Sequence, residues 1–273
     1  MLIVSGADRV YYRSLRQFLL SLERAGLSDQ LVLYDLGMTA QQRRWLSERY
    51  ELRVFPFDRY PDHVRLERGA YAWKPIIVAD LVSHYQGPVL WLDSATVVLG
   101  PLDRITREVE RTGVYTPFGG GGPIRVLPGP LTLTGVNPEL ARLRTRASGV
   151  CAFDGRREWV RALTERWKQW ALNGCIQNPP GARLAVHQFE QALLSLLLYD
   201  AQERGLVTLT RDALDISSPD PVPFLRTRNK VSNLIPMAAD PLVRAFYWLH
   251  RWLDVLAWRL RAPQGQGDLP TRP

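Results

Sequence analysis

Residues 71–102 read YAWKPIIVADLVSHYQGPVLWLDSATVVLGPL, and this stretch decides the fold class. Its centre is the apolar run Val89-Leu90-Trp91-Leu92, which follows the helix-breaking pair Gly87-Pro88 and predicts a buried strand. Before that pair, Pro75 suits the first turn of a helix. After the strand come Asp93-Ser94-Ala95-Thr96. Open parallel sheets bind ligands beyond the carboxyl ends of such strands, so these polar residues predict a site.

Strands and helices alternate on the N-terminal side of this stretch. Short apolar runs predict the strands, and apolar residues at helical spacing predict the helices between them. The expected strands are 2–4, 31–34 and 53–57, and the expected helices are 15–26 and 39–50, with Thr39 as the N-cap of the second. Such alternation is typical of a largely parallel sheet with helices on both faces.

On the C-terminal side the same pattern continues, less regularly. The expected strands are 114–116, 150–153 and 206–209, and the expected helices are 157–172 and 189–199. The four glycines at 119–122 lack the GxxxxGK[ST] pattern of a phosphate loop, so we interpret them as a flexible connection or a lid. Asn178-Pro179-Pro180-Gly181 predicts a turn.

The last quarter of the chain differs in composition. Residues 219–236 are Pro-rich and irregular, and apolar residues then recur at steps of four and three over 242–260, which predicts an amphipathic helix. We therefore expect a main domain at 1–215, a C-terminal extension with this helix at 216–262, and a disordered tail at 263–273. The helix either packs on its own domain, pairs with a second copy, or lies on a membrane surface.

Composition excludes several classes of protein. The chain has 273 residues, of which 46% are hydrophobic, so it can fill a large core and is not mainly disordered. Two cysteines, Cys151 and Cys175, exclude a disulfide scaffold, and no His/Cys cluster has zinc spacing. We find no run of about 18 uncharged apolar residues and no secretory signal at Met1. We therefore expect a cytoplasmic protein, with the inner membrane surface as the alternative location.

The chain is basic, with 35 Lys+Arg against 27 Asp+Glu and a net charge of +8. Nearly all of the basic residues are arginines, which bind phosphate and carboxylate through a planar fork. The excess suits a phosphorylated ligand, a nucleic acid or an anionic membrane, and a compositional bias of the genome explains it equally well. The arginines are dispersed and no known nucleic-acid-binding pattern is present, so we expect no nucleic-acid partner.

Polar motifs follow one another along the chain at the ends of the expected strands or the starts of the expected helices. They are Ser5-Gly6-Ala7-Asp8 with Tyr11, Trp73-Lys74-Pro75, Trp91-Leu92-Asp93-Ser94, Ala147-Ser148-Gly149-Val150 and His187-Gln188-Phe189-Glu190-Gln191. In this order they resemble the nucleotide-sugar-binding core of GT-A glycosyltransferases, especially family 8, the glycogenin-like group. The chain looks closer still to an uncharacterised offshoot with Trp-Lys-Pro, Trp-Leu-Asp-Ser and His-x-Phe-Glu-Gln motifs.

The resemblance implies a GT-A-like (Rossmann-like) mixed α/β fold, with a mostly parallel sheet flanked by helices. It also implies transfer of a hexose from a nucleotide-diphosphate donor, a UDP-sugar, to a hydroxyl of a glycan or lipid-linked acceptor, with retention at the anomeric carbon. Such reactions occur in surface polysaccharide and glycolipid synthesis. The implied residues are Ser5, Ala7, Tyr11, Lys74, Asp93 and Ser94 for donor binding, Glu190 and Gln191 for catalysis, and Ser148 and Gly149 on the acceptor side.

The leaving nucleoside diphosphate gains negative charge, so the site needs a cation. Asp93 could hold Mn²⁺ or Mg²⁺ through its carboxylate. The second Asp of the Asp-x-Asp motif is replaced by Ala95, which cannot coordinate a metal. His187 and Asp103 are the other candidates. Metal dependence is therefore open, and without a metal the arginines must supply the positive charge.

Each of these residues also has a purely structural interpretation. Asp93 could cap a turn, Lys74 could be a solvated lysine, and Trp73 and Trp91 are typical core residues. Glu190 lies in an otherwise apolar helix, where a buried carboxylate needs a partner. The alternative to a transferase is a catalytically silent glycan- or nucleotide-binding module associated with a membrane or an assembly, and Ala95 favours it.

Overall fold

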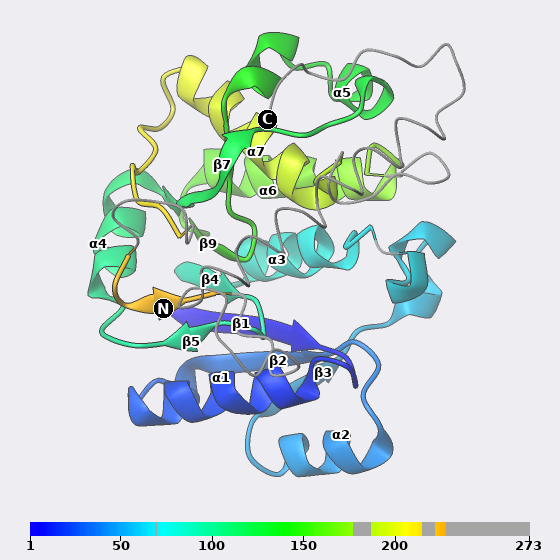
Figure 1. The fold of residues 1–273 in the computed structure, drawn as a ribbon, viewed down its shortest axis with the longest axis vertical. Helices are drawn as coiled ribbons and strands as arrows, with labels where there is room; N and C mark the ends of the chain where they lie inside the picture. The colour runs from blue at the N-terminus through cyan, green and yellow to red at the C-terminus, as the bar shows by residue number, and fades with distance from the viewer. Residues whose placement is uncertain (69, 177–186, 215–221, 228–273) are drawn as a thin grey trace, which may run out of the picture.

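The computed structural model describes residues 1–68, 70–176, 187–214 and 222–227, and its helices flank a central sheet (Figure 1). Among these residues the strands are β1 (Leu2–Ala7), β2 (Leu31–Asp35), β3 (Glu51–Val54), β4 (Pro88–Leu92), β5 (Val97–Val98), β6 (Val114–Tyr115), β7 (Phe118–Pro123), β8 (Arg144–Arg146), β9 (Val150–Asp154) and β10 (Leu225–Arg226). The α-helices are α1 (Tyr12–Arg24), α2 (Ala40–Ser47), α3 (Trp73–His84), α4 (Asp103–Thr112), α5 (Pro128–Thr134), α6 (Glu158–Leu172) and α7 (Phe189–Glu203). The short 3-10 helices are η1 (Ser28–Gln30), η2 (Phe57–Arg59), η3 (Asp62–Val64), η4 (Leu66–Arg68) and η5 (Pro138–Arg142).

Within the described residues the central sheet has six strands in the order β3-β2-β1-β4-β9-β6. The pairs β3–β2, β2–β1 and β1–β4 are parallel. Strand β9 runs antiparallel to both of its neighbours, β4 and β6. The predicted mixed α/β fold, with a mostly parallel sheet flanked by helices, is therefore confirmed.

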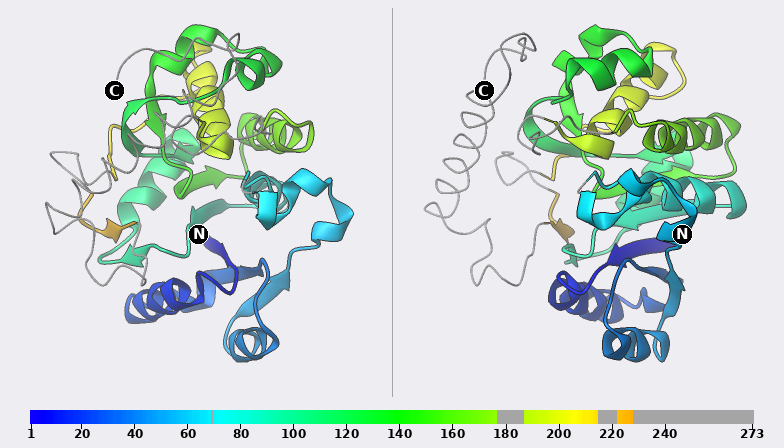
Figure 2. Two further views of the ribbon diagram at one scale, coloured as in Figure 1. Left: turned by 45° about the vertical axis from the view of Figure 1, so that its right-hand side comes forward. Right: turned by 90° about the vertical axis from the view of Figure 1, so that its right-hand side faces the viewer.

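Strand β4 is apolar throughout because both of its faces are covered. Val89 and Trp91 belong to one hydrophobic cluster, together with residues of α3, α6 and α7. Leu90 and Leu92 point the other way, into a cluster with residues of α1 and α4. Figures 1 and 2 show α1 and α2 on one side of the sheet and α3, α6 and α7 on the other. The core thus has two layers with β4 between them.

The strand directions bring three chain segments to one edge of the sheet. Val4 of β1 pairs with Trp91 of β4 in parallel, so both strands end at the same edge. Leu92 pairs with Val150 in the antiparallel ladder, so β9 begins where β4 ends. Residues that follow β1, follow β4 and precede β9 therefore lie close together.

Sequence reasoning recovered most of these elements but not the glycine run at 119–122. These glycines lie within β7, in the irregular part between Phe118 and Pro123, which pair with β8, and not in a connection between elements as expected. A Cβ on Gly119 would lie 2.8 Å from Ala147 Cα, which is too close for any side chain. Glycine therefore permits a close backbone approach at this position.

One further expectation is wrong, and helices α4 and α5 are absent from the expected elements. The segment Leu206–Leu209 is not a strand, because Leu209 N donates to Gln202 Oε1 at 3.2 Å instead of to a neighbouring strand. Helix α4 was missed, because charged residues surround its buried residues Ile105 and Val109. By contrast, Thr39 caps α2 as predicted, in a reciprocal capping box with Gln42.

Several predictions fall on residues that the structure does not describe. These are the turn at 178–181, most of the Pro-rich segment 219–236, the amphipathic helix over 242–260 and the tail 263–273. The division into 1–215, 216–262 and 263–273 therefore stays a prediction. In the part of the chain that is described, we find no helix with the length and apolar character needed to cross a membrane.

Gly113 ends α4 and is expected to tolerate no side chain. Its φ is +93°, and a Cβ there would lie 2.7 Å from Arg157 Cδ and 2.8 Å from Trp159 Cζ2. Gly205 also has a positive φ, +72°, but its Cβ would meet nothing within 4 Å. Urea unfolding should show that Gly205→Ala costs about 1 kcal/mol from backbone strain. Gly113→Ala should cost about 1–3 kcal/mol more from the clash. Equal losses would contradict the packing at Gly113.

Candidate functional site

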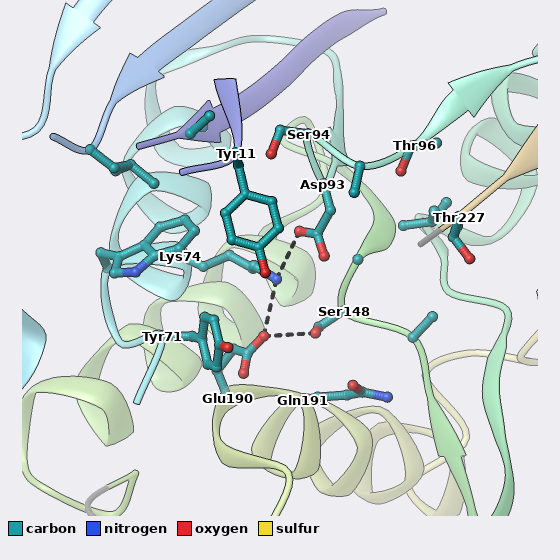
Figure 3. Close-up of a pocket in the computed structure, with 18 of the residues that line it drawn as sticks. Tyr11, Tyr71, Lys74, Asp93, Ser94, Thr96, Ser148, Glu190, Gln191 and Thr227 are labelled. Atoms are coloured by element: carbon teal, nitrogen blue, oxygen red, sulfur yellow. Dashed lines mark hydrogen bonds and ion pairs between the residues drawn. The ribbon is translucent and has the colours of Figure 1, made fainter. Parts of the chain in front are cut away.

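A cavity of about 490 Å³ lies at the sheet edge where β1, β4 and β9 meet (Figure 3). Its walls come from segments that are far apart in sequence, including the β1–α1 turn, the start of α3, the β4–β5 connection and the first turn of α7. The residues that line it are Gly6, Ala7, Asp8, Tyr11, Leu36, Leu66, Tyr71, Trp73, Lys74, Asp93, Ser94, Ala95, Thr96, Gly119, Ala147, Ser148, Gly149, Val150, Glu190, Gln191, Leu214 and Thr227.

Three charged side chains meet at the base of this cavity. Lys74 Nζ lies 3.0 Å from Asp93 Oδ1 and 3.0 Å from Glu190 Oε1. Ser148 Oγ donates to Glu190 Oε1 at 2.8 Å. The exposed fractions of the side chains are 4% for Lys74, 5% for Glu190 and 47% for Asp93. Asp93 is therefore the member of this ion triad, Lys74–Asp93–Glu190, that a ligand can reach.

Burial and the neighbouring charges shift the pKa values of Lys74 and Glu190 in opposite directions. Burial alone lowers the pKa of the Lys74 ammonium, but the carboxylates of Asp93 and Glu190 outweigh it and raise this pKa above its ordinary value. Burial raises the pKa of the Glu190 carboxyl, although Lys74 and the Ser148 hydrogen bond oppose this shift. Lys74 is therefore a cation at neutral pH, held between two acidic groups.

A strained residue lies at or just before the start of each helix that carries Lys74 or Glu190: Tyr71 lies two residues before α3, and Phe189 is the first residue of α7. Tyr71 has φ 54° and Phe189 has φ 48°, and they are the non-glycine residues with positive φ among those described. Their rings contact each other edge to face with centroids 5.8 Å apart. Left-handed backbone at such residues costs about 1–3 kcal/mol each and is often found at functional sites. The strain here lies beside the cavity.

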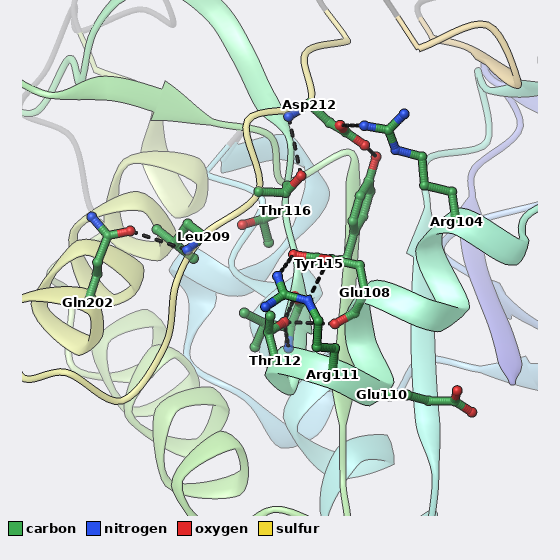
Figure 4. A network of polar contacts seen from close by, with 12 residues as sticks. Arg104, Glu108, Glu110, Arg111, Thr112, Tyr115, Thr116, Gln202, Leu209 and Asp212 are labelled. Carbon is green, nitrogen blue, oxygen red and sulfur yellow. Dashed lines mark hydrogen bonds and ion pairs between the residues drawn. The ribbon is translucent and has the colours of Figure 1, made fainter.

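A second polar network supports another part of the wall (Figure 4). Tyr115 Oη donates to Asp212 Oδ2 at 3.0 Å, and Arg104 forms an ion pair with Asp212. Burial, followed by the nearby Asp212 carboxylate, raises the pKa of Tyr115. Phe118 N donates to Asp212 O at 2.7 Å, and Leu214 N donates to Phe118 O at 3.0 Å. These bonds hold Leu214 against the cavity.

Most of the residues expected at the site lie together in the structure. Those that line the cavity are Ala7, Tyr11, Lys74, Asp93, Ser94, Ser148, Gly149, Glu190 and Gln191. Ser5 does not, because its side chain is fully buried in β1, where no described group forms a hydrogen bond with its hydroxyl. Cys151 and Cys175 are free and buried, as expected of small core residues.

Sequence reasoning did not single out several residues of the cavity. Tyr71 and Thr227 carry no motif, and their positions depend on how distant segments pack. Gly119 belongs to the glycine run, whose sequence predicts a flexible connection or a lid and does not indicate a close backbone contact in the cavity wall. Trp91 was assigned to the core, whereas its indole Nε1 also donates to Asp93 Oδ1 at 2.7 Å.

The charges on the cavity wall are mostly negative. Among the described lining residues, Asp8, Asp93 and Glu190 are acidic, and Lys74 is the basic one. No arginine lines the cavity in this part of the chain. The described residues include no group of three or more His, Cys, Asp or Glu side chains that could hold a metal.

His187 and Asp103, the alternative metal ligands, do not line the cavity. His187 is fully buried, and burial lowers its pKa to about 4. Ala95 does line the cavity, but it offers no ligand atom. Among the described residues, the carboxylates of Asp8 and Asp93 line the cavity without being buried, and Asp8 Oδ1 already accepts hydrogen bonds from Val10 N and Tyr11 N. These two groups do not complete a metal site.

Comparison with known proteins gives a family model and several solved structures. The model of a family described as "Protein of unknown function (DUF1647)" matches residues 1–79. No curated protein matches the chain.

The solved structures resemble the chain at low sequence identity. Galactosyltransferase LgtC, solved in complex with donor and acceptor sugar analogs, is 16% identical, with 100% of this chain and 98% of that chain covered and a TM-score of 0.44. The glycosyltransferase GlyE of Streptococcus pneumoniae TIGR4, in its apo form, is 14% identical, with 95% and 63% covered and a TM-score of 0.49. Mouse xyloside xylosyltransferase 1 is 12% identical, with 77% and 84% covered and a TM-score of 0.43. The chain thus spans less than two thirds of GlyE.

Replacing Lys74, the positively charged member of the triad, should lower the free energy of unfolding by an amount that depends on pH. In Lys74→Met the buried Glu190 loses its counter-charge, which should cost about 3–5 kcal/mol at pH 8. A carboxyl whose pKa is raised in the folded state binds a proton there, so stability falls as pH rises above the unfolded pKa. The loss should therefore be smaller at pH 5 than at pH 8. Urea unfolding at both pH values measures this.

The control is the double variant Lys74→Met/Glu190→Gln, which removes both buried charges. It should recover much of the stability lost in Lys74→Met and show a weaker dependence on pH. If Lys74→Met loses equal stability at pH 5 and pH 8, the buried pair is not formed as described.

Proposed function

We propose that this chain is a glycosyltransferase that moves a sugar from a UDP-sugar to a hydroxyl acceptor, with retention at the anomeric carbon. The observation that carries the proposal is the triad of Lys74, Asp93 and Glu190 in one cavity at the carboxyl end of β4. These residues are distant in sequence, and all three were expected at the site from motif order. Ligands of α/β sheets bind at this edge.

The cavity has the size and the mixed apolar and polar lining that a nucleotide sugar requires. Its volume of about 490 Å³ lies within the range of roughly 300–1,000 Å³ for small-molecule sites. Its lining includes the apolar and aromatic side chains of Tyr11, Leu36 and Tyr71. Ser94, Ser148 and Gln191 make another part of the wall polar. In our proposal the base lies against the aromatic residues and the sugar against the polar ones.

Asp93 and Lys74 act on the donor in this proposal. The half-exposed carboxylate of Asp93 accepts a hydrogen bond from a ribose hydroxyl or contributes one oxygen to a cation. The ammonium of Lys74 keeps Asp93 in place and adds a positive charge near the diphosphate. A bound Mn²⁺ or Mg²⁺ would stabilise the negative charge on the leaving diphosphate. The described residues alone do not complete a site for such an ion.

Glu190 and Gln191 act on the transferred sugar. Glu190 is fixed by Lys74 and Ser148, and its negative charge favours the positive charge that develops at the anomeric carbon. Gln191 lines the same cavity and can hydrogen-bond a sugar hydroxyl. Ser148 and Gly149 lie at the start of β9, on the acceptor side. In our proposal the acceptor is a glycan or a lipid-linked molecule.

Asp93→Asn and Glu190→Gln should each slow hydrolysis or transfer of the donor by about 100-fold or more, because each removes a charge that acts in the transition state. The assay measures UDP release from UDP-glucose, UDP-galactose and UDP-N-acetylglucosamine. Asp80→Asn is the matched control for Asp93→Asn, since the Asp80 side chain is similarly exposed, 43% against 47%, but does not line the cavity and pairs with Lys168 at 2.7 Å. Unchanged turnover in both site variants would reject the proposed site.

Ala95 favours a second candidate, a catalytically silent module that binds a nucleotide or glycan. The same set of donors separates the two functions. Calorimetric binding of UDP-sugars by the native protein, without hydrolysis or transfer to any acceptor, would favour the silent module. Turnover that depends on Asp93 and Glu190 supports the transferase.

Restoring the missing carboxylate should increase metal affinity. Ala95 lines the cavity two residues after Asp93, so Ala95→Asp adds a second acidic ligand to the same wall. The dissociation constant for Mn²⁺, measured by calorimetry without nucleotide, should fall about tenfold, since affinity for hard cations rises with ligand charge. Ala95→Asn, similar in size but neutral, is the control. If Ala95→Asp and Ala95→Asn bind Mn²⁺ equally, Asp93 does not belong to a cation site.

A further inference from the structure

The two oxygens of the Asp93 carboxylate have different surroundings. Oδ1 accepts a hydrogen bond from Trp91 Nε1 at 2.7 Å and lies 3.0 Å from Lys74 Nζ. Two N–H donors, one neutral and one charged, therefore converge on the same oxygen. Figure 3 shows Asp93 with this oxygen turned toward Lys74. Oδ1 is occupied by the protein itself.

Oδ2 occupies space that a side chain at position 149 would need. A Cβ on Gly149 would lie 2.7 Å from Asp93 Oδ2 and 3.2 Å from its Cγ. Asp93 N also donates to Gly149 O at 2.9 Å, so the two backbones are fixed to each other. The backbone of Gly149 is not left-handed, and an alanine would be acceptable there but for this contact. The glycine therefore makes room for the Asp93 carboxylate.

The polar group of Trp91 has one partner in the described structure. The Trp91 side chain is fully buried and packs beside Trp73, with ring centroids 5.8 Å apart. Lys74 Nζ lies 5.6 Å from the centre of its ring. A phenylalanine would supply a similar apolar surface, but a buried indole N–H needs an acceptor. Asp93 Oδ1 is that acceptor, so Trp91 links the core to the cavity.

We infer that Trp91 and Gly149 are positioning residues that fix the Asp93 carboxylate, so that it contacts a ligand through Oδ2 alone. A ligand hydroxyl or a cation then meets a single oxygen of known direction. Bidentate coordination of a cation by Asp93 would require Oδ1 to lose its contacts with Trp91 Nε1 and Lys74 Nζ. The nature of the ligand rests on the proposed function, whereas the orientation of Asp93 does not.

The orientation can be tested by the NMR signal of the Trp91 indole N–H, identified as the signal that Trp91→Phe removes. A charge-assisted hydrogen bond moves such a proton downfield, so Asp93→Asn should shift it upfield. Asp80→Asn, which alters a carboxylate paired with Lys168, should leave it in place. A Trp91 indole signal that does not respond to Asp93→Asn would overturn the inference.

The effect on a ligand can be tested with UDP and Mn²⁺ by calorimetry. Trp91→Phe and Gly149→Ala should each weaken UDP binding about tenfold, the size expected when a charged hydrogen-bonding group is lost. Two variants serve as controls. Gly129→Ala adds a methyl group with nothing within 4 Å. Trp45→Phe alters a tryptophan that contacts Arg16 and Arg49. Both should bind as the native protein does.

The double variant Trp91→Phe/Gly149→Ala separates positioning from general damage. Since both changes act through one carboxylate, the double variant should lose little more affinity than either single variant. Losses that multiply would overturn the inference, because they indicate two independent effects. If the native protein binds no UDP at all, the donor assignment fails, and the indole signal still decides whether Asp93 is oriented as inferred.

Discussion

A buried ammonium that must be neutralised is the constraint on which the site depends. Lys74 is almost fully enclosed, so its charge requires partners that approach from outside its own helix. Asp93 arrives from the end of β4 and Glu190 from the start of α7. An apolar residue at position 74 would pack without them. The charge therefore contributes mainly to the specific arrangement of three segments, and this arrangement forms the base of the cavity.

Much of the fold could be predicted from local patterns, and the main site residues could be predicted from the resemblance of the motifs to those of GT-A glycosyltransferases. The four apolar residues of β4, between a helix breaker and an aspartate, gave both the central strand and the place of the site. Thr39 with Gln42 is a purely local signal, and α2 begins there. Lys74, Asp93 and Glu190 could be assigned to one site because the order of their motifs along the chain resembles that in GT-A glycosyltransferases.

The remaining features depend on contacts between distant residues, which local patterns do not encode. The glycines at 119–122 look like a loop until Ala147 lies against Gly119. Leu206–Leu209 has the composition of a strand, but none of the described strands pairs with it. The left-handed backbone at Tyr71 and Phe189 arises where two helices start next to each other. Trp91 is a typical core residue in an apolar strand. Its hydrogen bond to Asp93 depends on the rotamers of both side chains, which the sequence does not reveal.

The reversed direction of β9 has a consequence for how the cavity could diversify. Strand β9 lies between β4 and β6 and runs antiparallel to both. The chain leaves the central sheet after β6, forms β7, α5 and β8, and re-enters the sheet as β9; we call this segment the excursion. One part of the cavity wall is built before this excursion, from β1 and β4. An insertion or replacement in the excursion would remodel the part of the wall formed by Gly119 and residues 147–149, while the part formed by β1 and β4 stayed intact. The architecture thus allows related chains to keep one recognition surface and exchange the other.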